Sequence, residues 1–179
     1  MLFTTLINII IALVKFILGL TLPSLWFFIN AIFGFILSLA RVFSIKDYRK
    51  IRKLNSHEDK KRIAFKNYVN NGVLLIFLGI AYFAVSVYMF YKGTNTTMHE
   101  YLTYLVALIA FCSIGNAIYG MCKYRKNNNA ILSAVKITSF ANALTSIVLT
   151  QVVLLDTFNS GMDLRIANGA TGMAASIAI

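Results

Sequence analysis

The sequence predicts an all-α fold: a polytopic transmembrane helical bundle with five to six hydrophobic segments and a basic amphipathic cytoplasmic connector. Composition is the first reason. Of the 179 residues, 59% are hydrophobic and 13% are charged, whereas a soluble domain carries about 25% charged residues. The second reason is that the apolar residues form long runs, most of them near the ~20 residues that a helix needs to cross a bilayer. The chain is therefore suited to lipid rather than to water.

Charge placement predicts the orientation. Thirteen of the seventeen Lys and Arg residues lie in segments 41–66 and 123–126, and each segment ends a hydrophobic run. Cytoplasmic loops of membrane proteins carry this excess of positive residues. We therefore predict a multi-pass integral membrane protein with loops 41–66 and 123–129 in the cytoplasm. Because this orientation explains the net charge of +11, we expect no nucleic-acid partner.

Residues 1–40 are predicted to form an N-terminal helical hairpin. Their apolar run is longer than one span requires, and Pro23 interrupts it. Proline is tolerated in the first turn of a helix but breaks the hydrogen-bond ladder inside one. The preferred interpretation is two helices at roughly 2–20 and 24–40, with Trp26 just inside the outer interface. The alternatives are one long kinked helix, or an interfacial first helix followed by a single span.

Each helix of this hairpin carries a line of small or polar residues at helical spacing. The first line is Thr4, Asn8, Ala12, Lys15 and Gly19, and the second is Asn30, Gly34 and Ser38. Small residues four apart let transmembrane helices approach closely, so the two lines are expected to face each other. Lys15 would then be buried and need a partner, with Glu100 and Asp156 as the candidates. The alternative is a first helix that lies shallower in the membrane.

Residues 41–69 are predicted to form the basic cytoplasmic connector. Sparse apolar positions among its Lys and Arg residues indicate an amphipathic helix that lies on an anionic membrane surface. Anionic lipid headgroups are expected to bind four basic residues of this helix: Arg49, Lys50, Arg52 and Lys53. Ser56 followed by Asp59 resembles a capping box. The next helix should therefore start near His57 and run straight into the membrane.

Residues 70–179 are predicted to form the main transmembrane bundle. Three of its apolar runs are long enough to span a bilayer: 70–91, 101–122 and 130–155. The last segment, 165–179, supplies about 15 residues, or roughly 22 Å of helix, which is less than the ~30 Å hydrocarbon core. Gly169 and Gly172 in this segment are typical of a helix that packs closely on a neighbour.

The span 130–155 carries a polar stripe with two interpretations. Its members fall within about 120° of arc at 100° per residue: Lys136, Ser139, Asn142, Ser146 and Thr150. Polar residues in a span generally face protein or a water-filled cavity. The stripe either lines a pathway for an ion or polar solute, or forms interhelical hydrogen bonds while Lys136 snorkels towards the basic loop. Asn116, on the preceding span, is interpreted either as an interhelical hydrogen-bonding residue or as a ligand contact.

The sequence lacks motifs of catalysis and metal binding. No cluster of Asp, Glu or His lies deep in a span, and neither an H-E-x-x-H motif nor a P-loop is present. Cys112 and Cys122 are about 15 Å apart along one predicted helix, which is too far for a disulfide. We therefore expect no enzyme activity, no metal and no cofactor.

These observations favour a non-enzymatic integral membrane protein that works through helix–helix association, as a homo-oligomer or as a subunit of a membrane complex. The alternative is a small channel or facilitator for an ion or polar solute, lined by the stripe from Lys136 to Thr150, in which Lys136 would favour anions. The expected partners are the lipid bilayer, its anionic headgroups, and either a second copy of the chain or another membrane protein.

Overall fold

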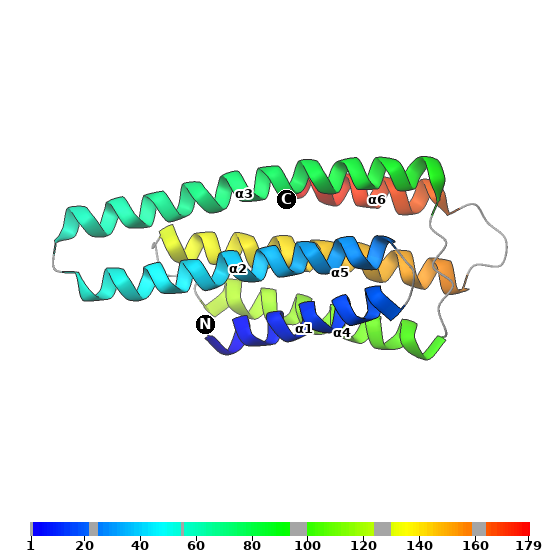
Figure 1. Cartoon of the computed structure of the whole chain (residues 1–179), viewed down its shortest axis with the longest axis horizontal. Helices are drawn as coiled ribbons and strands as arrows, with labels where there is room; N and C mark the ends of the chain where they lie inside the picture. Colours follow the sequence, from blue (N-terminus) through cyan, green and yellow to red (C-terminus); the bar gives the residue numbers. More distant parts are fainter. Residues whose placement is uncertain (1, 22–24, 55, 94–99, 124–129, 159–163) are drawn as a thin grey trace.

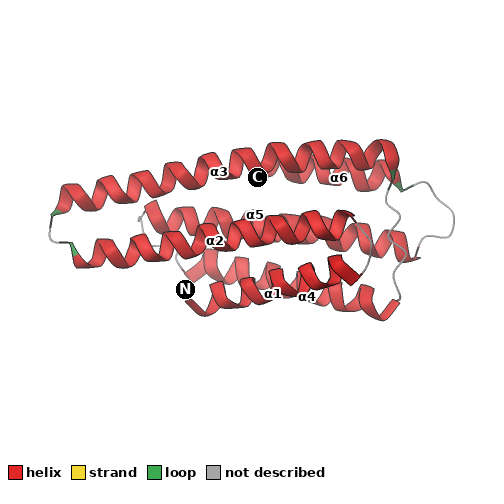
Figure 2. Cartoon of the chain, in the orientation of Figure 1, coloured by secondary structure: helices red, strands yellow, loops and turns green. Residues whose placement is uncertain are grey.

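The structure is a computed structural model that describes residues 2–21, 25–54, 56–93, 100–123, 130–158 and 164–179. Helices make up nearly all of these residues and no strand occurs among them, which confirms the all-α class (Figure 1, Figure 2). The helices are α1 (Leu2–Thr21), α2 (Leu25–Lys53), α3 (His57–Lys92), α4 (Glu100–Lys123), α5 (Ala130–Phe158) and α6 (Arg165–Ala178).

Four of these helices have the length and apolar composition needed to cross a membrane. They cover Trp26–Lys53, His57–Lys92, Tyr101–Tyr119 and Ala130–Phe158. The 14 residues of α6 rise by about 21 Å, which is less than the ~30 Å hydrocarbon core. The structure is therefore consistent with a multi-pass membrane protein that has four candidate spans, and the larger number of five to six segments stays a prediction.

Helix α5 lies at the centre of the bundle. It contacts α2, α3, α4 and α6, and its buried side chains, among them Leu149, Val152 and Val153, belong to the hydrophobic core. Figure 1 shows consecutive helices running in opposite directions along one long axis. Helices α1, α3 and α5 therefore all begin at the same end, which we call the basic end because the basic residues of 41–54 and 56–66 lie there, as does Lys123 at the end of α4.

The N-terminal region forms two separate antiparallel helices, α1 and α2, rather than one kinked helix. A Cβ added at Gly34 of α2 would lie 3.7 Å from the Cβ of Ala12 on α1, so the two lines of small residues meet. Asn30 and Ser38, on either side of Gly34, are buried. The side chains of three members of the first line lie outside the described residues: Thr4, Asn8 and Lys15.

Trp26 differs from the interfacial residue that the sequence predicts. Its side chain is 3% exposed and packs on Tyr82 of α3, with ring centroids 5.4 Å apart. Phe33 contacts the same tyrosine, at a centroid distance of 5.1 Å. The indole ring therefore belongs to the interior, where it joins α2 to α3, and does not face lipid.

Helices α2 and α3 project together past the other helices at the basic end (Figure 1). We call this pair, residues 44–53 of α2 and 57–71 of α3, the arm. Ile45 and Ile51 are buried in it. The segment predicted as the connector, 41–69, is not a separate helix: α2 runs through residue 41 without a break, and Ile45 and Ile51 pack inside the helix pair. Its location on the cytoplasmic membrane surface stays a prediction.

The turn at the tip of the arm is short. The Ser56 side chain accepts a hydrogen bond from the backbone N–H of Asp59, and α3 begins at His57. This confirms the predicted start of the helix. Acidic residues in the first turn of α3 and basic residues in the last turn of α2 both match the helix dipole.

Two side-chain hydrogen bonds close the bundle at the end opposite the arm. The hydroxyls of Thr103 on α4 and Thr157 on α5 are 2.8 Å apart. Asn168 Nδ2 of α6 donates to Asp156 Oδ1 of α5 at 3.1 Å. Helices α4 and α6 are thus held to α5 by polar contacts as well as by packing.

Glycines set the distance between α6 and α3. A Cβ added at Gly169 would lie 2.7 Å from the Cβ of Phe90 and 2.9 Å from its Cα, and one added at Gly172 would lie 2.5 Å from Ser86 Oγ. Real Cβ atoms do not approach other atoms so closely. Both residues, which the sequence analysis marks as packing positions, are therefore in contact with the neighbouring helix.

Gly169→Ala should destabilise the protein, because the new methyl group overlaps the backbone of Phe90. Overpacking of this kind costs about 1–3 kcal/mol, which corresponds to a fall in Tm of roughly 2–4 °C per kcal/mol for a chain of this size. Thermal unfolding in detergent measures it. Gly115→Ala is the matched control, because a Cβ there meets nothing within 4 Å; equal Tm values for the two variants would contradict the packing.

Candidate functional site

A buried polar network joins α2 to α3 at the base of the arm. Ser44 Oγ donates to Asn67 Oδ1 at 3.1 Å, and Asn67 Nδ2 donates to Asp47 Oδ2 at 2.7 Å. Asn71 Nδ2 lies 3.1 Å from Ser44 Oγ and 3.0 Å from Asn67 Oδ1. Because Ser44, Asn67 and Asn71 are all buried, each bond left unmade would cost free energy.

This network was not predicted from the sequence, although the spacing of its residues indicates it. Asn67 and Asn71 are four residues apart on one helix, and Ser44 and Asp47 are three apart on the other, so each pair shares a helix face. Because residues 41–69 were predicted to form one connector on the membrane surface, these two helix faces were not expected to contact each other. The antiparallel arm brings them together.

Arg41 lies one helical turn from the network, inside the bundle. Its side chain is 5% exposed, and its Nε has no hydrogen-bond partner. The nearest acid along the sequence is Asp47, which accepts from Asn67 and lies about 9 Å further along the helix axis. Buried cations are normally paired, yet the described part of the chain offers Arg41 no carboxylate.

The polar stripe predicted on α5 is satisfied largely by α5 itself. The hydroxyls of Ser139, Ser146 and Thr150 each donate to the backbone carbonyl four residues earlier, a common arrangement for hydroxyl side chains in membrane helices. Ser146 is fully buried, whereas Ser139 and Thr150 are half-buried. These bonds account for the three hydroxyls without a solute.

The stripe also contains an amide and a lysine. Asn142 is buried near the point where α1, α2 and α5 meet, because its Oδ1 would lie 3.8 Å from a Cβ added at Gly34. Lys136 is half-buried, two turns closer to the basic end. Asn142 thus lies at a helix–helix contact.

The remaining predicted residues are not brought together. Asn116 of α4 is half-buried, and Cys112 and Tyr119 on the same face are exposed. The side chain of Lys15 lies outside the described residues. The four basic residues expected to bind lipid are all exposed near the tip of the arm: Arg49, Lys50, Arg52 and Lys53.

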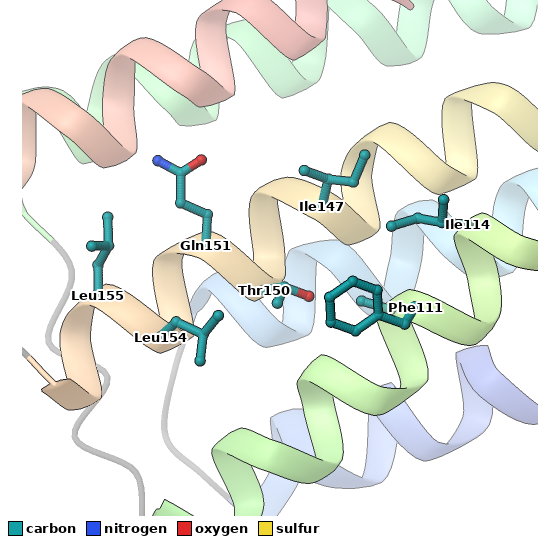
Figure 3. Close-up of a pocket in the computed structure, with 8 residues that line it drawn as sticks. Phe111, Ile114, Ile147, Thr150, Gln151, Leu154 and Leu155 are labelled. Carbon is teal, nitrogen blue, oxygen red and sulfur yellow. The ribbon is translucent and has the colours of Figure 1, made fainter.

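A groove of about 310 Å³ lies between α4 and α5. The surface that its walls expose is apolar, and Thr150 and Gln151 are the two polar residues among those that line it. Figure 3 shows Thr150 on the side of α5 near Phe111, whereas the Gln151 amide points away from α4 at the rim of the groove. Gln151 is half-buried, and no hydrogen bond of its side chain occurs among the described residues.

Comparisons with known proteins assign neither a family nor a function to the chain. No protein-family model and no curated protein matches the chain. Within the described residues, no three His, Cys, Asp or Glu side chains gather as a metal site would require, and Cys112 and Cys122 are free and exposed. The groove, the polar network and Arg41 are therefore the features on which a function can be argued.

Asn67→Ala should loosen the arm, because it removes the donor to Asp47 and the acceptor shared by Ser44 and Asn71. A buried polar group left without a partner costs about 1–3 kcal/mol. Hydrogen exchange of the α2 and α3 amides, together with Tm, measures the loss. Asn70→Ala, at an exposed position of the same helix, is the control, and equal exchange in the two variants would argue against the network.

Proposed function

We propose that this protein is a non-enzymatic integral membrane protein that acts by associating with a second copy of itself in the bilayer. The observation that supports this most directly is the groove between α4 and α5 with Gln151 at its rim. In this proposal the arm lies in the cytoplasm, as the positive-inside rule predicts.

The position of Gln151 favours a protein partner over lipid. It lies five residues before Asp156 on α5, or about 7.5 Å along the helix, and its neighbours in the groove are Ile147, Leu154 and Leu155. An amide at this depth gains from a hydrogen bond that acyl chains cannot supply. Interhelical bonds of this kind contribute about 1–2 kcal/mol.

A second copy is the occupant that this chemistry fits best. An amide carries both donors and an acceptor, so two Gln151 side chains related by a two-fold axis can bond to each other. The apolar surface around the amide supplies the packing: Phe111 is 68% exposed and Ile147 is 43% exposed. A side chain of the second copy would fill the groove and so cover both residues.

Gln151→Leu should weaken the dimer roughly tenfold, because about 1.4 kcal/mol corresponds to a factor of ten in Kd. Energy transfer between labelled copies in proteoliposomes, measured over a range of protein-to-lipid ratios, gives that Kd. Gln151→Asn retains an amide and should remain close to wild type. A wild-type protein that stays monomeric at every ratio, or a Gln151→Leu variant that dimerises normally, would refute the proposal.

A small channel or facilitator remains the alternative proposal, because Lys136 and the stripe on α5 are polar over most of a span. A double substitution, Ser139→Ala with Asn142→Leu, separates the two functions. A channel would lose most of its solute flux in liposomes while its mass in nanodiscs stays unchanged. Association through α4 and α5 predicts no wild-type flux above that of empty liposomes, so robust wild-type flux would favour the channel.

A further inference from the structure

We propose that Arg41 and the N-termini of α1 and α5 form a binding site for a phosphate group, supplied by an anionic lipid headgroup at the basic end of the bundle. This inference is independent of the proposed dimer. It rests on a buried cation, Arg41, for which the described residues offer no carboxylate.

The register of α2 places Arg41 on the face of this helix that meets α1 and α5. At Gly34, α2 meets both Ala12 of α1 and Asn142 of α5. Arg41 is seven residues further on, which is two turns of helix and therefore the same face. Seven residues from Ala12 towards the basic end, α1 is within two turns of its first residue, Leu2. Seven residues from Asn142 in the same direction, α5 is within two turns of its first residue, Ala130.

Both helix N-termini at this seam favour an anion. Figure 1 shows α1 and α5 starting at the same end, beside α2. The start of a helix carries roughly half a positive charge, which favours a phosphate group there. Helix α4, whose negative C-terminal end also lies here, makes no contact with α2 among the described residues. Arg41 therefore adds its positive charge to a region that is already positive.

No acidic side chain that the structure describes is placed to compensate this charge. The sequence contains six: Asp47, Glu58, Asp59, Glu100, Asp156 and Asp163. Asp47 is engaged with Asn67, and Glu58 and Asp59 lie at the tip of the arm. Glu100 is the first residue of α4 and Asp156 lies in the last turn of α5, both at the opposite end of the bundle, and Asp163 lies outside the described residues. An anion from outside the chain would supply the missing negative charge.

Phosphate is the anion that the position of Arg41 favours. Arg41 lies 16 residues after Leu25, or about 24 Å along α2, close to the headgroups of the inner leaflet if α2 enters the ~30 Å core near Leu25. The guanidinium group binds phosphate through two parallel hydrogen bonds. Basic pockets between membrane helices on the cytoplasmic side bind anionic headgroups in this way.

The test uses the full-length protein, delipidated in a neutral detergent and phosphate-free buffer. Phosphatidylglycerol and inorganic phosphate are titrated separately, and Tm is recorded. Wild type should gain about 5–10 °C at saturating phosphatidylglycerol, and the gain should persist in 0.5 M NaCl because a buried pair is poorly screened. Arg41→Gln should show no saturable gain, and Arg41→Lys a smaller one than wild type.

Arg49→Gln is the matched control, because it removes an exposed arginine from the same helix and should retain the full gain. Arg41→Gln should be at least as stable as wild type before any anion is added, because it removes an unpaired buried charge. A gain with phosphatidylglycerol alone supports the lipid headgroup, and a gain with inorganic phosphate that also requires Arg41 supports the site with a soluble source. Either an Arg41→Gln protein with the wild-type gain, or a wild-type protein without a gain, would overturn the site.

Discussion

Polar side chains that leave water for the middle of a membrane must find their partners inside the protein, and this constraint organises the bundle. On α5 the hydroxyls of Ser139, Ser146 and Thr150 donate hydrogen bonds to backbone carbonyls of the same helix. At the base of the arm, amide and hydroxyl groups from two helices satisfy one another. Some described polar groups remain without a hydrogen bond, among them Arg41 Nε in the interior and the Gln151 amide beside the groove.

The parts of the fold that depend on composition and local signals could be predicted from the sequence. Long apolar runs revealed the helices, because each run needs only its own residues to become a helix. Ser56 marked the start of α3 because a cap involves neighbours three residues apart. Gly169 and Gly172 were recognised as packing positions because small residues in a membrane helix have few other uses.

What could not be predicted depends on which helices become neighbours. Trp26 has the composition of an interface residue, and only the position of Tyr82 on a distant helix makes it an interior one. The Ser44–Asn67 bond joins residues 23 positions apart, so neither helix shows it alone. Arg41 looked like the first of ten basic residues in the connector, whereas its burial follows from the meeting of three helices.

The unbroken course of α2 has a mechanical consequence. A single rigid rod runs from Leu25 through the seam at Gly34 to Lys53 at the tip of the arm. Within the arm, the polar network holds α2 to α3, so a force applied at the tip would move both helices as a unit. Tilting this lever by a few degrees would change the spacing of α1 and α5 around Gly34, deep within the bundle.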